Sequence, residues 1–365
     1  MPQPIRTPAY EQLDSLLADR ILILDGAMGT MIQALHLTEA DIRGERFSSH
    51  HKDLGRFSDI LCITRAKDIT EIHRKYLAAG ADIIETNTFG ASFVGMEEFQ
   101  LPRELVREIN TAATRCARAA ADEFTERTPD KPRFVAGSLG PTAKQMAIST
   151  RVDDPAWRGV TFDEMVDSYY EQVAALVEAG VDLLLPETVI DTLNLKACLF
   201  AIEKYFQLKG RRLPVIASGT FDKGGVTFVS GQSVEAFWDA IDHVPLLAVG
   251  MNCALGPELM RPHIEEMAQV ATTRISCYPN AGLPNEMGQY DLGPAAMAQM
   301  LGEWAGNGWL NIIGGCCGTT PEHIAAIAER MKRDRPHQPH QQPHWLRLSG
   351  TLPFTQRPEI GRAHV

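Results

Sequence analysis

The sequence predicts a (β/α)₈ barrel of the TIM type, formed by a single domain with a C-terminal tail rich in Pro, His and Gln. Three observations predict it: eight short apolar runs, helical patterns between the runs, and polar residues directly after them. Continuous apolar runs are typical of parallel strands buried on both faces. Eight such strands favour a closed barrel. The alternative is an open, doubly wound sheet, which would bring fewer strand ends to one point.

The predicted elements alternate along the chain. The eight strands lie at 21–24, 83–85, 134–137, 183–185, 215–218, 246–252, 275–278 and 310–313. Apolar residues recur three, four and seven positions apart at 69–76, 105–116, 173–177 and 324–327, which predicts amphipathic helices between the strands. In such a barrel the active site lies at the carboxyl ends of the strands, where the polar residues gather.

The barrel is expected to occupy residues 10–335, followed by a linker or tail over 336–365. The tail begins with a run of Pro, His and Gln, a composition typical of linkers. Its histidines, His337, His340 and His344, could bind a metal, but their irregular spacing favours a solvated linker.

Composition and charge narrow the function classes. A net charge of −11 over 365 residues argues against a nucleic-acid partner, whose phosphates require clustered Lys and Arg. No apolar run approaches the ~20 residues of a membrane span. The seven cysteines and the acidic residues near the N-terminus indicate a reducing cytoplasmic location.

Three cysteines are the most informative residues. Cys316 and Cys317 are adjacent in a glycine-rich run, and Cys253 lies sixty-three residues before Cys316. Three thiolates could hold one Zn²⁺ and leave its fourth position open, as in catalytic sites. Adjacent strand residues point to opposite faces, so the backbone must turn here, and the flanking glycines permit it. A vicinal disulfide or buried free thiols are the alternatives.

The chemistry of such a site favours a thiol substrate. Zn²⁺ with three thiolates carries a net charge of −1, so an added substrate thiolate would stay both ionised and nucleophilic. Asp25, after the first strand, and Glu187, after the fourth, could bind one ammonium group. Backbone N–H groups near Gly26 and Gly29 could receive a carboxylate. The alternatives are a helix N-cap for Asp25 and a structural acid for Glu187.

Six motifs carry a resemblance to a known family. They are Asp-Gly-Ala-Met-Gly-Thr at 25–30, Glu-Thr-Asn-Thr-Phe-Gly at 85–90, Gly-Ser-Leu-Gly-Pro-Thr at 137–142, Pro-Glu-Thr at 186–188, Gly-Met-Asn-Cys at 250–253 and Gly-Gly-Cys-Cys-Gly-Thr-Thr-Pro at 314–321. Together they resemble the homocysteine S-methyltransferases, most closely the homocysteine-binding module of the cobalamin-dependent methionine synthases. The likeness covers about residues 10–335.

The resemblance implies a zinc site of Cys253, Cys316 and Cys317, which homocysteine sulfur joins as a further ligand. It also implies that Asp25 and Glu187 hold the homocysteine amine, with amides near Ala27 to Gly29 or Ser138 for the carboxylate. The full predicted set of substrate-binding residues is Asp25, Ala27, Met28, Gly29, Ser138, Glu187 and Asn252. Asn252, a nearby main-chain oxygen or a water oxygen is in addition a candidate to cap zinc when substrate is absent.

The implied reaction is zinc-dependent methyl transfer to homocysteine, giving methionine. Methylcobalamin, recharged from 5-methyltetrahydrofolate, would be the donor, held by a further module or a partner chain. One alternative is a stand-alone enzyme that uses S-methylmethionine or betaine. Another is a non-catalytic zinc- or thiol-binding module.

The C-terminal end suggests a longer gene. Residues 347–350 resemble the entry to a folate-binding module, and residues 359–365 can be encoded by DNA that resembles a sequencing adapter. We therefore expect a truncated gene, with a naturally split enzyme as the alternative.

Overall fold

Eight parallel strands form the centre of the computed structural model, which describes residues 3–343 and 345–356. They confirm all eight predicted strands, with small shifts at the ends. The strands are β2 (Leu22–Ile23), β3 (Ile83–Glu85), β4 (Phe134–Leu139), β5 (Leu183–Pro186), β7 (Ile216–Gly219), β8 (Ala248–Asn252), β9 (Arg274–Tyr278) and β10 (Ile312–Ile313).

The strands close into a ring. Five pair in parallel in the order β2-β10-β9-β8-β7, and three in the order β3-β4-β5. Two parallel bridges, Leu24 to Ile83 and Leu184 to Val215, join the two sheets at both seams. The fold is therefore the predicted closed barrel and not the open sheet.

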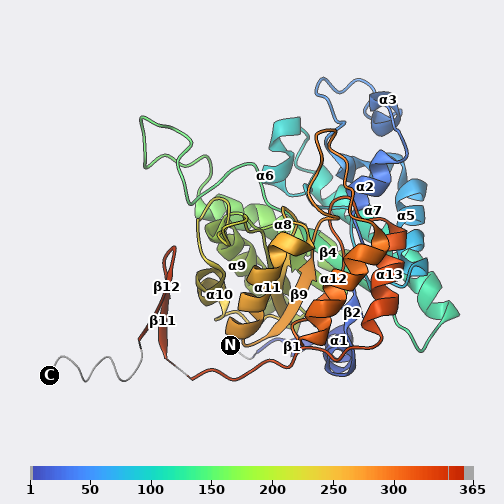
Figure 1. The fold of residues 1–365 in the computed structure, drawn as a ribbon. Coiled ribbons are helices and arrows are strands. Elements are labelled where there is room, and N and C mark those ends of the chain that lie inside the picture. The colour runs from blue at the N-terminus through green and yellow to red at the C-terminus, as the bar shows by residue number, and fades with distance from the viewer. Residues whose placement is uncertain (1–2, 344, 357–365) are drawn as a thin grey trace.

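Helices cover the outside of the ring (Figure 1). They are α5 (Ala66–Ala78), α7 (Leu105–Arg127), α8 (Phe162–Ala179), α9 (Thr192–Lys209), α10 (Val234–Ile241), α11 (Pro257–Val270), α12 (Pro294–Gly306) and α13 (Pro321–Met331). The periodic patterns predicted α5, α7, α8 and α13. The pattern of α9 is blurred because its buried residues include polar ones and extend around much of the helix. No helix in the described ranges is long and apolar enough to cross a membrane.

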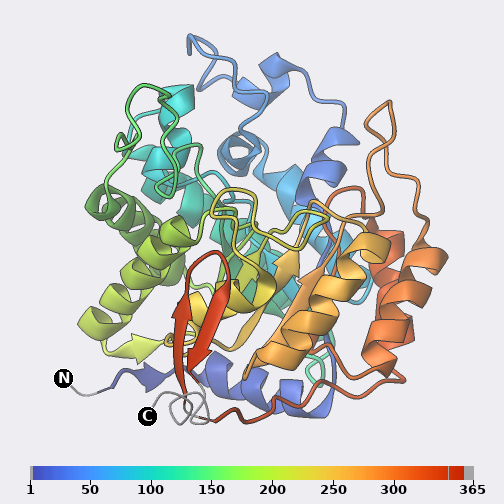
Figure 2. The ribbon, with the colours of Figure 1, turned by 60° about the vertical axis from the view of Figure 1, so that its left-hand side comes forward.

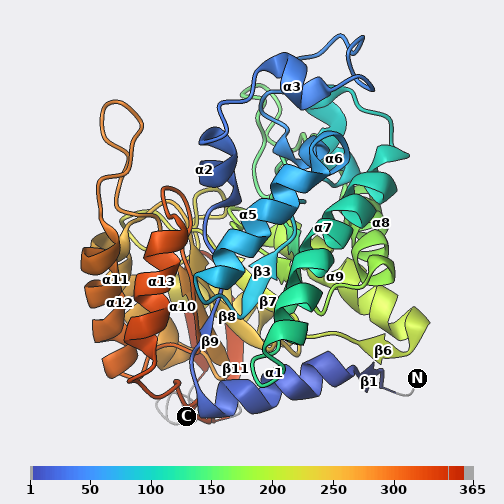
Figure 3. The same cartoon turned by 90° about the vertical axis from the view of Figure 1, so that its right-hand side faces the viewer.

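The amino-terminal end of the barrel is closed by helix α1 (Pro8–Asp19), which runs across its base (Figure 3). Leu13 and Leu17 of α1 are buried with the inward-facing residues of the barrel, including Leu22 and Ile312. Before α1, strand β1 (Ile5–Arg6) pairs with β6 (Arg211–Arg212). The apolar end of the barrel interior is thus sealed, and the polar end faces the opposite side.

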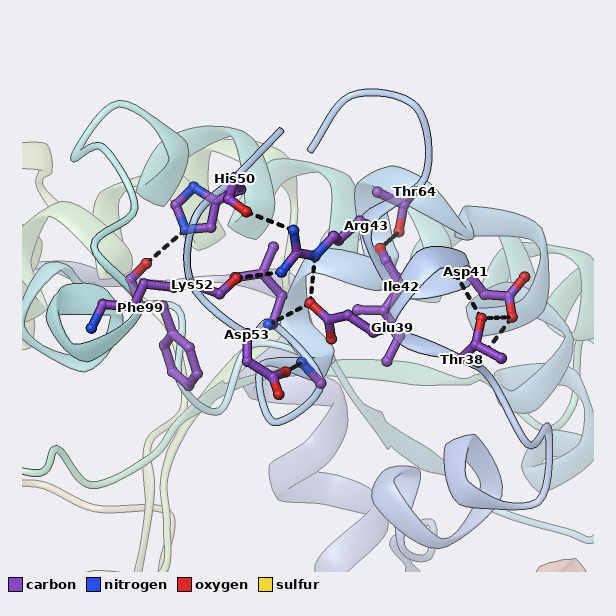
Figure 4. A network of polar contacts seen from close by, with 12 residues as sticks. Thr38, Glu39, Asp41, Ile42, Arg43, His50, Lys52, Asp53, Thr64 and Phe99 are labelled. Atoms are coloured by element: carbon purple, nitrogen blue, oxygen red, sulfur yellow. Dashed lines mark hydrogen bonds and ion pairs between the residues drawn. The ribbon is translucent and has the colours of Figure 1, made fainter. Parts of the chain in front are cut away.

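Short helices lie above that polar end. They are α2 (Met28–Gln33), α3 (Glu39–Arg43), the 3₁₀ helices η1 (Ser58–Ile60) and η2 (Glu97–Phe99), α4 (Leu61–Thr64) and α6 (Phe93–Met96). Arg43 organises the irregular segment after α3, since its guanidinium donates to the carbonyl oxygens of His50 at 2.6 Å and Lys52 at 2.8 Å (Figure 4). These polar bonds hold the segment together with three buried side chains that it adds to the core, Phe47, Leu54 and Phe57.

The tail is more ordered than the predicted linker. His337 is buried, its N–H donates to the Leu310 carbonyl at 2.9 Å, and its own carbonyl accepts from Asn311 Nδ2 at 2.8 Å. A hairpin of β11 (Leu346–Ser349) and β12 (Pro353–Gln356) lies beside α10 (Figure 2). The prediction of a solvated linker is therefore wrong for His337, because polar groups at the base of the barrel need partners. His344 and residues 359–365 lie outside the described residues.

Candidate active site

A cavity of about 440 Å³ opens at the carboxyl ends of the barrel strands. Side chains that follow or end seven of the eight strands line it. They are Asp25, Glu85, Ser138, Glu187, Cys253, Tyr278, Cys316 and Cys317. The cavity lies where the polar strand ends predict the site.

The three predicted cysteines meet in this cavity. Their sulfur atoms all lie within 4.8 Å of one another, and the Sγ atoms of Cys253 and Cys317 are 3.8 Å apart. Tetrahedral Zn²⁺ with Zn–S bonds of ~2.3 Å places two sulfurs ~3.8 Å apart, so the spacing fits one zinc ion. All three thiols are free in the structure, with no disulfide between Cys316 and Cys317, and all three are partly exposed. Within the described residues no other group of Cys, His or acidic side chains has such an arrangement.

Two unusual backbone positions aim the cysteines at one point. Cys253 follows β8 in the left-handed conformation, with φ of +61°, which costs energy for a residue that carries a Cβ. Gly318, with φ of +81°, turns the chain directly after Cys317, and a Cβ there would lie 2.3 Å from the ring of Tyr290. Strain of this kind persists where surrounding contacts impose it, often at functional sites.

The charge state of the cluster indicates a need for a cation. Hydrogen bonds from the thiols of Cys253 and Cys316 lower the pKa of Cys317 to about 3. The same close contacts raise the pKa of Cys316 far above its ordinary value. One thiolate is therefore favourable by itself, whereas three thiolates need a positive ion between them.

Three carboxyl groups lie beside the cysteines. Asp25 and Glu187 are buried and face the same cavity, as predicted, and Glu85 joins them. Asp25 Oδ2 accepts the Glu85 backbone N–H at 3.1 Å, so Asp25 does not cap a helix; the N-cap of α2 is Ala27. Burial raises the pKa of all three carboxyls, that of Glu187 to about 7. No Lys, Arg or His is among the described residues that line the cavity.

The other predicted substrate-binding residues divide into two groups. Ala27, Met28, Gly29 and Ser138 line the cavity. The Ala27 N–H already donates to Thr319 Oγ1 at 3.1 Å, and the Ser138 N–H to Thr86 Oγ1 at 3.1 Å. Of the predicted carboxylate donors, this leaves the amides of Met28 and Gly29 as the better candidates.

Asn252 is not among the residues that line the cavity. Its side-chain oxygen accepts the Ser218 hydroxyl at 2.6 Å and the Thr188 N–H at 3.0 Å, while its Nδ2 donates to Thr188 Oγ1 at 2.8 Å. The structure therefore places Asn252 as a brace between the ends of β5, β7 and β8, next to the turn that carries Cys253.

Four residues that shape the site are not in the predicted set of metal- and substrate-binding residues: Glu85, Tyr278, Tyr290 and Thr319. Glu85 ends a strand, as the other acids nearly do, and that signal could have identified it. Thr319 links the two halves of the site, since its hydroxyl donates to the Cys316 carbonyl at 2.7 Å and accepts from Ala27. Tyr290 comes from an irregular loop and hydrogen-bonds to Cys317.

Fold and site together define a barrel protein with a cluster of three cysteines that could hold a metal ion, beside an acidic pocket at the carboxyl ends of the strands. The model of the family described as homocysteine S-methyltransferase matches residues 22–331. The chain therefore belongs to the homocysteine S-methyltransferase family, and it is a methyltransferase that acts on homocysteine.

Solved structures agree with the fold. The metallated form of the homocysteine methyltransferase MmuM from Escherichia coli superposes with a TM-score of 0.69 at 24% identity, over 89% of this chain and 100% of that chain. Its oxidized form gives a TM-score of 0.65 at 24% identity, over 85% of this chain and 96% of that one. At this level of identity the likeness establishes the shared barrel.

Proposed function

We propose that the chain binds one Zn²⁺ through Cys253, Cys316 and Cys317 and transfers a methyl group to the sulfur of homocysteine, giving methionine. The observation that carries this proposal is the convergence of three free thiols, spaced for one zinc ion, beside acids that suit the amine of an amino acid. Zinc, when bound, would supply the positive charge that keeps the homocysteine thiol ionised near neutral pH.

The residues of the chain would then orient the substrate. Asp25 and Glu187 accept hydrogen bonds from the amine, and the amides of Met28 and Gly29 receive the carboxylate. The thiol proton leaves to solvent on binding, and the sulfur lone pair forms the new bond to the methyl carbon. The bond between that carbon and the donor breaks, and its electron pair stays with the donor. A reducing compartment, expected to be the cytoplasm, keeps the seven free cysteines in this form.

For the donor we favour methylcobalamin, recharged from 5-methyltetrahydrofolate by a further module or a partner chain. The local motifs support this choice. A corrinoid would have to be presented at the mouth from outside, because the cavity of about 440 Å³ suits only small molecules.

A small donor such as S-methylmethionine or betaine is the second candidate, and one observation favours it. The match covers 89% of this chain and 100% of the MmuM chain. A chain of about this size, with no further module in the match, is therefore described as a homocysteine methyltransferase. The present barrel would then need no corrinoid partner.

The test is to incubate the purified, zinc-loaded chain with homocysteine and each of methylcobalamin, S-methylmethionine and betaine, and to measure methionine. Formation from one donor identifies the route and excludes a purely zinc- or thiol-binding role. Cys316→Ser is the matched inactive control. The proposal is wrong if the chain binds no zinc, or if no donor gives methionine.

A further inference from the structure

Glu85 is a partly buried acid in the cavity, and the pairing of Asp25 with Glu187 leaves it without a role. It ends β3, lines the same cavity, and its carboxyl lies within hydrogen-bonding reach of that of Glu187. Its backbone N–H meanwhile donates to Asp25 Oδ2 at 3.1 Å. Glu85 thus contacts both of the acids expected to hold the amine.

The three acids approach the cavity from three directions. Asp25 follows β2, Glu85 ends β3 and Glu187 follows β5, while Ser138 of β4 donates its hydroxyl to Glu187. No ion pair joins any of the three to a basic side chain in the described part of the chain, and no basic residue lines the cavity there. Buried carboxylates without a cation are costly, so the site is built to receive a positive charge from its ligand.

A primary ammonium group offers three N–H donors and no acceptor. Three acids arranged around one point can each accept one of these bonds, whereas two acids leave one donor without an anionic partner. We infer that Glu85 is the third acceptor for the substrate amine, and that the three acids together make the site specific for a primary ammonium group. This inference rests on the proposed function, because it concerns the same substrate.

The electrostatics agree with this arrangement. Burial, followed by repulsion from Glu187 and Asp25, raises the pKa of Glu85. In the empty site the Glu85 and Glu187 carboxyls can share one proton, as closely spaced carboxyl pairs do. An arriving ammonium replaces that shared proton as the positive partner.

The test compares thiols that differ only in the amino group. Calorimetry on the zinc-loaded protein would measure the binding of homocysteine, its N,N-dimethyl derivative and the des-amino thiol 4-sulfanylbutanoate. The unaltered protein should prefer homocysteine over both analogues by roughly 10-fold or more, the loss expected for charge-assisted hydrogen bonds. Glu85→Gln should weaken homocysteine roughly 10-fold while zinc content and the affinity for 4-sulfanylbutanoate stay unchanged.

Two further variants serve as the positive and the negative control. Glu187→Gln should show the same selective loss, and Glu258→Gln, which removes an exposed acid on α11, should show none. Equal weakening of all three thiols by Glu85→Gln would make Glu85 a structural residue and overturn the inference. So would an unaltered protein that binds the three thiols equally, which would leave the zinc-thiolate proposal standing. If no thiol binds at all, the proposed function fails first.

Discussion

Buried acids lie at both ends of this barrel, and several of them lie at the end that carries the cavity. Asp59 is one outside the cavity itself: it is 4% exposed, and its Oδ1 accepts the Gly90 N–H at 2.8 Å. It thereby fixes the loop that carries Asn87 and Phe89 to the cavity wall. Burial raises the pKa of Asp59 to about 7, although N–H bonds from the loop partly offset that effect.

A pH-dependent stability follows from this carboxyl. Because its folded pKa lies above the unfolded value of about 3.8, its contribution is full at acid pH and is lost as pH rises toward 7. Asp59→Asn should remove this slope, so the free energy of unfolding measured by urea at pH 5 and pH 8 should change by about 2 kcal/mol less than in the unaltered protein. Asp153→Asn, on an exposed loop, is the control. Parallel pH profiles for all three proteins would contradict the prediction.

Individual elements show how local backbone geometry supports the chemistry. The turn after Cys317 depends on Gly318, whose φ is +81° and whose missing Cβ makes room for the Tyr290 ring. The loop that carries Tyr290 has a second positive-φ glycine, Gly288, with open space around it. A side chain at Gly288 would meet only the backbone strain of a positive φ, whereas a side chain at Gly318 would also collide with the Tyr290 ring. Comparing substitutions at the two positions therefore distinguishes the two costs.

Gly288→Ala should cost only the strain of the positive φ, about 1 kcal/mol. Gly318→Ala should cost more and should also displace Tyr290 and Cys317, so that zinc affinity falls. Chemical denaturation and zinc competition with a chromogenic chelator would measure the two effects. Equal stability and equal zinc affinity in the two variants would show that the ring contact is unimportant.

Helix α1 is the element that seals the other end of the barrel. Leu13 is fully buried in the barrel interior, whereas Leu16, one turn on, is only partly buried against it. Leu13→Ala should lower the free energy of unfolding by about 2–5 kcal/mol, and Leu16→Ala by clearly less. Zinc content should stay the same in both, since the metal site lies at the opposite end. An equal loss in both variants would mean that α1 does not plug the interior.

At the scale of the whole molecule, stability and chemistry are separate. The apolar cores of the barrel and its helices involve Cys316 only as a partly buried neighbour, so the fold should not depend on zinc. The eight strands and the outer helices supply the buried area, and the three-cysteine cluster adds a binding site at one rim.

Metal removal should therefore abolish methyl transfer while it leaves the barrel folded. A chelator-treated protein and Cys316→Ala should both lose most of the zinc, keep the far-UV circular dichroism spectrum, and melt at a modestly lower temperature, because ligand binding stabilises by mass action. Cys198→Ala, which removes a buried cysteine in α9 outside the site, should keep its zinc. Full zinc occupancy in Cys316→Ala, or unfolding of the metal-free protein, would refute this separation.

The sequence by itself determined the closed barrel, the three cysteines and the acids Asp25 and Glu187. These follow from local patterns: short apolar strands, glycine at turns, and polar residues placed after strands. The sequence also predicted that these residues meet at one end of the barrel, because the carboxyl ends of parallel strands lie on one face.

Only the tertiary structure decided which further residues join them. Thr319 and Tyr290 reach the site through contacts between segments far apart in the chain, which no local pattern encodes. Glu85 ends a strand as a local pattern predicts, but only the closed barrel brings it beside Asp25 and Glu187. The same holds for His337, which the composition of its segment assigned to solvent and which partners at the base of the barrel bury. Local periodicity shows which face of a helix or strand is apolar. Which distant residue a side chain then contacts depends on how all eight βα units pack into the closed barrel.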